Sequence, residues 1–362
     1  MKEHMKFEDI AYLRLANQHI ENTNLKTPQD IVSYMGAMQT QNFLMSKWAV
    51  GIRLQNVTET KIEEAYNKGE ILRTHVLRPT WHLVSSNDIY WMLKLTAPRI
   101  KSISKARWKE LELTELVLKK CNRIIEKALS SGEHLTRDQL KELLEKAKIN
   151  TAQNRLSHIL LRAELDGLIC SGADKGKNTT YALFPERVSR SNRLSKEEAL
   201  AALANRYFTS HGPATLEDFI WWSGLTIKDA KQGLESVKSN FLSETIDSVT
   251  YWFTDSNFSS RKTKSSAHLL PAFDEFIISY KDRSAALTSE EHSKAISANG
   301  MFYPTILVNG KVAGLWKRVI KKDKVIIEAQ FFEQPNSSIK KQFIDESIKF
   351  GKFMGKRVKV II

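Results

Sequence analysis

Two glutamines separated by one residue form the most specific chemical signal in this sequence. Gln39 and Gln41 flank Thr40 at the start of a predicted helix. Their carboxamide oxygens could accept hydrogen bonds from one water molecule without adding charge to the site. Because an amide is a weak base, such a water could attack only a bond whose leaving group is already activated. The alternative is that the two glutamines cap a helix or contact a phosphate.

Polar residues on a predicted hairpin at 71–84 could support such a site. His82 lies on a strand two residues after Thr80. If the hairpin packs behind the glutamine pair, both side chains could orient a glutamine. The alternative for His82 is a buried structural histidine.

Two adjacent acids, Asp274 and Glu275, could act as a general acid and base. They lie between phenylalanines and shortly before the charged run 281–283, and this setting favours a structural charge cluster. Asp274 is kept as a supporting catalytic candidate. Three tryptophans near the ends of predicted elements are interpreted as core residues rather than base-stacking residues: Trp81, Trp221 and Trp222.

Several kinds of site are not indicated. The nine histidines show no ligand spacing, so we expect no metal. Gly172 and Gly176 lack the flanks of a phosphate-binding loop, which argues against nucleotide hydrolysis, and no cofactor is expected. Cys121 and Cys170 are interpreted as ordinary buried thiols.

The charge balance points to a polyanionic partner. The 362 residues include 55 Lys and Arg against 41 Asp and Glu, a net charge of +14, and residues 259–362 contain 19 basic and 10 acidic side chains. Basic side chains that replace counterions on phosphates favour nucleic acid, although a solvated basic face is the alternative. No apolar run approaches the roughly 20 residues that span a bilayer, and the N-terminus lacks an apolar signal core, so we expect a cytoplasmic protein with no membrane contact.

The elements that must position these residues follow a recurring order. Residues 132–184 predict a helix capped by Thr136, a turn, a second helix over 153–166 that stops at Gly167, and two strands around a loop with two lysines. Helix, turn, helix, strand, basic loop and strand is the order of a winged helix, whose second helix can enter a major groove. Residues 195–254 repeat this order.

The N-terminal third fits a third copy, with helices near 7–19, 28–37, 41–54 and 58–68 before the hairpin. After a polar stretch at 256–266, the last hundred residues predict a small α+β unit with a hairpin turn at Asn309-Gly310. The predicted fold class is α+β, mainly helical, with tandem winged helices. The predicted units are 1–110, 111–190, 191–258 and 259–362.

Three sequence segments resemble the AlkZ-like winged-helix DNA glycosylases in order and spacing. They are MQTQN at 38–42 with WAVGIR at 48–53, LRT at 72–74 with LRPTWHLV at 77–84, and LLPAFDE at 269–275 with YKDR at 280–283. The resemblance covers nearly the whole chain. One departure is Thr40, because the residue between the family's glutamines is usually apolar.

The resemblance implies tandem winged helices around a basic concave surface, and an enzyme that removes alkylated purines or unhooks interstrand crosslinks. An N7-alkylated or N3-alkylated purine is already cationic and can leave without a general acid. What remains is to place a water and stabilise the oxocarbenium-like sugar, and Gln39 and Gln41 are the catalytic candidates. Thr80 and His82 could also contact the nucleotide that carries the lesion.

We therefore predict a monofunctional, metal-free DNA glycosylase that binds double-stranded DNA as a monomer and is associated with the nucleoid. The alternatives are a non-catalytic winged-helix DNA-binding protein or regulator, which would be dimeric and sequence-specific, and a scaffold that binds protein. The side chains expected to contact DNA are Arg53, Arg73, Arg78, Arg99, Lys101, Lys105, Arg107, Lys175, Lys177 and Arg283.

Overall fold

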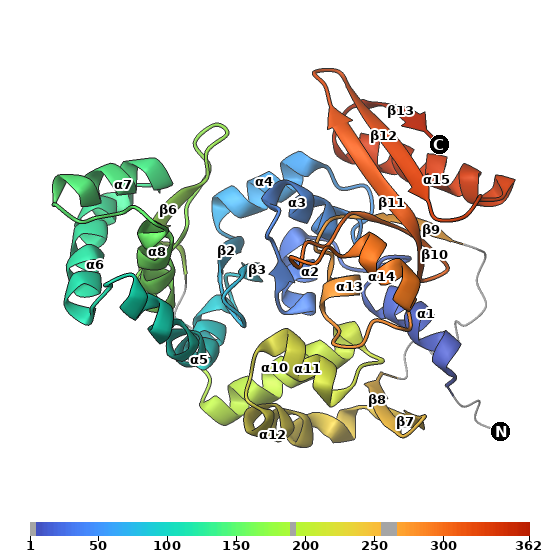
Figure 1. The fold of residues 1–362 in the computed structure, drawn as a ribbon, viewed down its shortest axis with the longest axis horizontal. Helices are drawn as coiled ribbons and strands as arrows, with labels where there is room; N and C mark the ends of the chain where they lie inside the picture. The colour runs from blue at the N-terminus through green and yellow to red at the C-terminus, as the bar shows by residue number, and fades with distance from the viewer. Residues whose placement is uncertain (1–4, 189–192, 255–265) are drawn as a thin grey trace. The chain divides into compact units, whose positions relative to one another are not determined.

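The computed structural model describes residues 5–188, 193–254 and 266–362, and its elements are labelled in Figure 1. The chain forms two compact units. Unit 1 combines residues 1–63 with residues 200–362, and unit 2 is the continuous segment 64–199. This grouping differs from the four consecutive segments expected from the sequence. The reason is that the N-terminal helices complete their core with residues from the far end of the chain.

Unit 1 begins with short helices whose starts are set by side-chain caps. Thr27 accepts a hydrogen bond from the Asp30 N–H, and Pro28 occupies the first helical position, where no N–H is needed. Asn42 caps the next helix by accepting from the Met45 N–H. The N-terminal elements are α1 (Phe7–Asn17), α2 (Pro28–Met35), β1 (Met38–Gln39), α3 (Phe43–Gly51) and α4 (Glu59–Lys68).

The middle of unit 1 is a helical group closed by a two-stranded ribbon. Thr215 and Thr226 cap their helices through hydrogen bonds from the N–H groups of Asp218 and Asp229. The ribbon pairs antiparallel from Leu242 opposite Phe253. The elements are α10 (Lys196–His211), α11 (Leu216–Ser223), α12 (Ile227–Val237), the 3₁₀ turn η2 (Lys238–Asn240), β7 (Leu242–Ile246) and β8 (Val249–Phe253).

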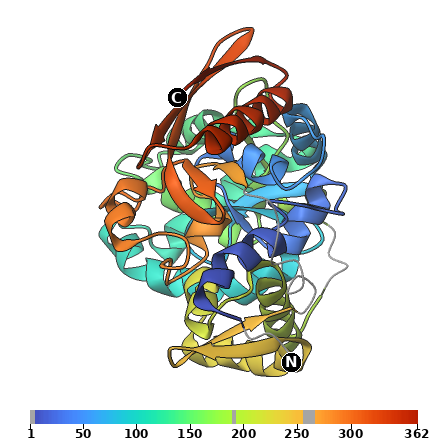
Figure 2. The same ribbon diagram turned by 90° about the vertical axis from the view of Figure 1, so that its right-hand side faces the viewer.

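A five-stranded sheet in the order β13-β12-β11-β10-β9 ends unit 1. The β10–β11 hairpin turns at Asn309 and Gly310, which both adopt positive φ, as a tight hairpin turn requires. Helix α15 packs along β9, β12 and β13 and is visible beside the strands in Figure 2. The elements are β9 (Ala267–Leu270), α13 (Glu275–Ile278), α14 (Ser289–Ala295), β10 (Thr305–Val308), β11 (Lys311–Ile320), β12 (Lys324–Phe331), α15 (Ser337–Phe353) and β13 (Arg357–Ile361).

A buried tryptophan, Trp48, joins α3 to this sheet. The Trp48 indole donates to the Leu269 carbonyl at 2.7 Å, and its ring meets the edge of Phe350 in α15 at 5.1 Å. Helix α3 also approaches α15 closely at Gly51, where an added Cβ would lie 2.5 Å from the Phe353 ring. These contacts fix the segment before α3 relative to the segment after β9, since both elements share one core.

The described residues of unit 2 form a hairpin, a group of helices and a three-stranded sheet. The hairpin pairs Ile71 with Ser85 and His75 with Trp81. The sheet has the order β4-β6-β5, and its helices close over an apolar core that includes Leu140, Leu144 and Ile159. The elements are β2 (Ile71–His75), β3 (Trp81–Ser85), α5 (Ile89–Glu110), α6 (Glu115–Leu129), η1 (Ser130–Gly132), β4 (Leu135–Thr136), α7 (Arg137–Lys146), α8 (Arg155–Leu165), β5 (Ile169–Ser171), β6 (Thr180–Leu183) and α9 (Phe184–Arg187).

The mixture of helices and strands confirms the α+β class, and most predicted elements occur within two or three residues of the expected bounds. The predicted cap at Thr136 and the turn at Asn309-Gly310 are both present. Residues 255–265 of the predicted polar stretch lie outside the described residues. Within the described ranges, every helix is too short or too polar to cross a membrane.

Candidate active site

The Gln-Thr-Gln segment runs from the last residue of β1 toward α3, so it lies just before a helix, as the sequence predicts. Gln39 is 6 % exposed, whereas Gln41 is exposed, immediately before the cap of α3. Thr40 is fully buried, and its hydroxyl lies 2.8 Å from the Ser46 hydroxyl in the first turns of α3. Because this hydrogen bond satisfies the hydroxyl, a polar residue can occupy a position that is usually apolar.

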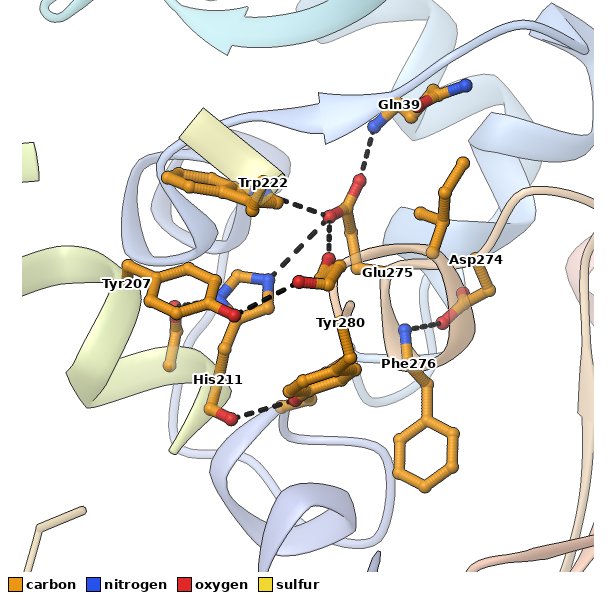
Figure 3. A network of polar contacts seen from close by, with 12 residues as sticks. Gln39, Tyr207, His211, Trp222, Asp274, Glu275, Phe276 and Tyr280 are labelled. Atoms are coloured by element: carbon orange, nitrogen blue, oxygen red, sulfur yellow. Dashed lines mark hydrogen bonds and ion pairs between the residues drawn. The ribbon is translucent and has the colours of Figure 1, made fainter. Parts of the chain in front are cut away.

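A buried carboxylate holds the main chain of Gln39 (Figure 3). The Gln39 N–H donates to Glu275 Oε1 at 2.5 Å, and the Gln39 carboxamide extends away from this contact. The other carboxylate oxygen, Oε2, accepts from the Trp222 indole N–H at 3.1 Å and from the Ser279 hydroxyl. Glu275 is only 1 % exposed, so these donors replace the water that a carboxylate normally binds.

His211 faces the same carboxylate. Its Nε2 lies 3.6 Å from Glu275 Oε2, and its ring stacks on Tyr207. Its other nitrogen, Nδ1, lies 2.7 Å from the hydroxyl of Ser210. The same hydroxyl donates to the Arg206 carbonyl, and the tautomer of the ring sets the role of Nδ1 in this contact.

For both Glu275 and His211, burial and the neighbouring groups shift the pKa in opposite directions. Burial alone would raise the pKa of Glu275, but the contacts with His211, Ser279 and the Gln39 N–H lower it to about 2. Burial lowers the pKa of His211, and the charge of Glu275 opposes that shift without reversing it. Glu275 is therefore an anion at neutral pH, and among the contacts that lower its pKa, His211 makes the largest contribution.

Arg53 and Asp274 form a buried ion pair, which corrects two expectations. Both Arg53 amino groups donate to the Asp274 carboxylate, at 2.8 and 2.9 Å, and both residues are 2 % exposed or less. Arg53 also donates to the Gln18 side chain, and Asp274 caps α13 through the Phe276 N–H. The prediction that Arg53 contacts DNA is wrong, because its guanidinium is bound inside the protein. Asp274 is likewise bound inside the protein, in the structural charge cluster that its sequence setting favours, and not in the supporting catalytic role for which it was kept.

The supporting hairpin residues lie in unit 2. His82 is fully buried, and its Nδ1 lies 2.9 Å from the Thr80 carbonyl. Thr80 is partly buried at the start of β3. Their action on a glutamine or a nucleotide stays a prediction.

The remaining basic candidates divide into exposed and packed side chains. Lys101 pairs with Asp166 at 2.6 Å, Arg73 lies over the Trp81 ring, and Arg283 donates to the Ile277 carbonyl. Arg78 is partly buried in the turn between β2 and β3. The exposed candidates are Arg99, Lys105 and Arg107 on α5, and Lys175 and Lys177 in the loop between β5 and β6.

Other features of the described residues contribute no further catalytic group. A cavity of about 490 Å³ in unit 1 is lined by residues such as His19, Asn56 and Lys349, and neither glutamine lines it. Across residues 5–188, 193–254 and 266–362, no three His, Cys, Asp or Glu side chains are grouped as metal ligands. Trp222 is a core residue, as predicted, whereas Trp221 is 38 % exposed.

Comparison with known proteins identifies the family. The model of the family described as DNA glycosylase AlkZ-like matches residues 32–348. This chain belongs to the AlkZ-like DNA glycosylases. An interstrand DNA cross-link repair glycosylase from Streptomyces sahachiroi is 21% identical over 338 residues, which cover 84% of this chain and 86% of that protein. The structure of the DNA glycosylase AlkZ from Streptomyces sahachiroi matches with a TM-score of 0.80 at 17% identity, covering 99% of this chain and 100% of the other.

Membership in the AlkZ-like family confirms the predicted enzyme class and decides against a transcriptional regulator or a protein-binding scaffold. No sequence motif predicts the placement of Glu275 and His211 next to Gln39. A signal was present, since Glu275 directly precedes the apolar run from Phe276 to Ile278. A carboxylate in such a run must find buried donors.

Proposed function

We propose that this AlkZ-like glycosylase hydrolyses the N-glycosidic bond of cationic N7-alkylated or N3-alkylated purines in double-stranded DNA. The observation that supports this most is the placement of Gln39 and Gln41 on a short segment anchored from inside unit 1, in a chain of this family. The segment is held by the Glu275 carboxylate on one side and by the cap of α3 on the other.

In the proposed reaction, the oxygens of Gln39 and Gln41 accept hydrogen bonds from a water molecule and direct its lone pair at the anomeric carbon. The bond to the purine breaks as the water oxygen bonds to that carbon, and the electron pair leaves with the base and neutralises its charge. The water's extra proton passes to solvent. The amide dipoles stabilise the positive sugar in the transition state.

We propose that winged helices hold the DNA. In unit 2, the order β4, α7, α8, β5, β6 and the strand order β4-β6-β5 support this interpretation. In unit 1, α11, α12, β7 and β8 follow the same helix-helix-ribbon order. Helix α8 would enter the major groove, and the exposed Lys175 and Lys177 would contact phosphates, giving affinity that depends on salt more than on sequence.

Interstrand crosslinks are a second substrate class. The relative from Streptomyces sahachiroi is described as an interstrand DNA cross-link repair glycosylase, and a crosslink through purine N7 has the same cationic leaving group. We propose that the enzyme acts as a monomer on chromosomal DNA in the cytoplasm, without metal or cofactor.

Release of 7-methylguanine from methylated duplex DNA tests this proposal. We expect wild-type protein to release the base, and Gln39→Ala and Gln41→Ala each to slow single-turnover release by about 100-fold while DNA affinity stays within about twofold. Unchanged release in both variants would refute the glutamine-held water. If wild-type protein binds duplex tightly but releases neither 7-methylguanine nor a base from an N7-crosslinked duplex, the assignment to cationic purines fails.

A further inference from the structure

We propose that Glu275 is a positioning residue that sets the main-chain geometry of Gln39. This inference rests on the proposed function of Gln39 as a water-binding residue. Glu275 is 236 residues away in the chain, yet its carboxylate accepts the Gln39 N–H at 2.5 Å in a buried setting. Hydrogen bonds to a charged acceptor are shorter and stronger than those between neutral groups.

Glu275 is itself held in place by two side-chain donors and by its position at the start of α13. The Trp222 indole and the Ser279 hydroxyl donate to its second oxygen, so the carboxylate has little rotational freedom. It is the first residue of α13, and the preceding residue, Asp274, is anchored by Arg53. Through Glu275, the core of unit 1 therefore fixes the position of the Gln39 N–H.

A carboxylate suits this position better than an amide. Glu275 accepts from a main-chain N–H, an indole N–H and a hydroxyl, and it has no hydrogen of its own to place. A glutamine side chain would direct two N–H groups at some of these same donors. The Gln39 segment would then shift to relieve the conflict, and displacements of about 1 Å at a reacting group can cost about 100-fold in rate.

Glu275→Gln tests the inference with the full-length protein. We expect single-turnover release of 7-methylguanine to fall about 10-fold to 100-fold, with the Kd for duplex DNA within about twofold. The matched control is Asp218→Asn, which alters a carboxylate that is equally buried and accepts from the N–H groups of Thr215 and Lys281. This control should be less stable than wild-type protein. At a temperature where it is folded, it should release 7-methylguanine at the wild-type rate.

A double-mutant cycle separates positioning from general damage. If Glu275 acts through Gln39, adding Glu275→Gln to Gln39→Ala should slow release by less than about twofold further. Multiplicative losses in the double variant would overturn the inference. Ser279→Ala serves if Glu275→Gln fails to fold, because it removes only one donor to the carboxylate. We expect it to slow release about threefold, and an unchanged rate would also count against the proposal.

A readout without catalysis keeps this inference separate from the proposed function. Hydrogen exchange at the Gln39 amide should be at least about 10-fold faster in Glu275→Gln than in Asp218→Asn at equal temperature. Unaltered exchange would overturn the inference even if release falls. A different result separates the two proposals. If exchange is faster in Glu275→Gln but wild-type protein releases no base, or Gln39→Ala releases it at the wild-type rate, the Glu275 contact is supported and the water mechanism fails.

Discussion

Charged residues have opposite surroundings in two regions of this AlkZ-like glycosylase. In the interior of unit 1, Arg53, Asp274 and Glu275 are 2 % exposed or less, and each makes several hydrogen bonds. In unit 2, Lys175 and Lys177 extend from the loop between β5 and β6 into solvent. Both regions add to the charge count of the chain, but only the second can displace counterions from a DNA backbone.

The difference shows what a charged side chain needs in order to bind DNA. A buried arginine has already exchanged its hydration for protein partners, so a phosphate would have to displace those partners. An exposed lysine exchanges only water and counterions. The surroundings of a charge, rather than its sign alone, therefore separate structural cations from candidate DNA contacts.

The strongest way to break this comparison is Arg53→Met. Removing one member of a buried ion pair leaves the other charge without compensation, so we expect the free energy of unfolding to fall by about 3–5 kcal/mol, measured by denaturant titration. The double variant Arg53→Met/Asp274→Leu should recover part of this loss. If Arg53 instead contacts DNA, the single variant will keep its stability and lose affinity for duplex.

The wrong prediction for Arg53 shows which contacts local sequence patterns do not predict. Periodicity and capping residues such as Thr136 and Thr226 predict helices correctly, because the interactions that start a helix are local. The partner of Arg53 is 221 residues away along the chain, and a local sequence pattern cannot predict so distant a contact. For Asp274 the sequence setting favours a structural charge cluster, and the buried ion pair agrees with that interpretation rather than with the supporting catalytic role for which the residue was kept.

A smaller change is expected from pH. Burial holds the pKa of His211 below the usual 6.5, so the unfolded chain takes up a proton on this residue at a pH where the folded protein does not. Stability should therefore fall as the pH drops below about 6.5. His211→Phe removes this proton uptake and should flatten the dependence of unfolding free energy on pH between pH 7.5 and 5.5.

Equal slopes for wild-type protein and His211→Phe over that range would contradict the burial-driven shift. His19 is a useful comparison, because burial also lowers its pKa. Its substitution by Phe should remove a separate part of the same slope and leave the His211 contribution in place.

The smallest effect on folding is expected in the exposed loop. Lys175→Ala and Lys177→Ala should each change the free energy of unfolding by less than about 0.5 kcal/mol. If the loop contacts phosphates as proposed, each substitution should reduce the slope of log affinity against log salt concentration by about 0.9. An unchanged slope in the double variant would remove this loop from the DNA interface and leave the exposed side chains of α5 as the next candidates.

The discontinuity of unit 1 has a consequence for synthesis on the ribosome. Residues 64–199 form one continuous unit, so they can fold while the rest of the chain is still being made. Residues 1–63 emerge first, yet Trp48 docks on β9 and Gln39 binds Glu275, which emerge much later. A nascent or prematurely terminated chain thus exposes the glutamine segment before its supports exist, and the proposed catalytic geometry is among the last features to form.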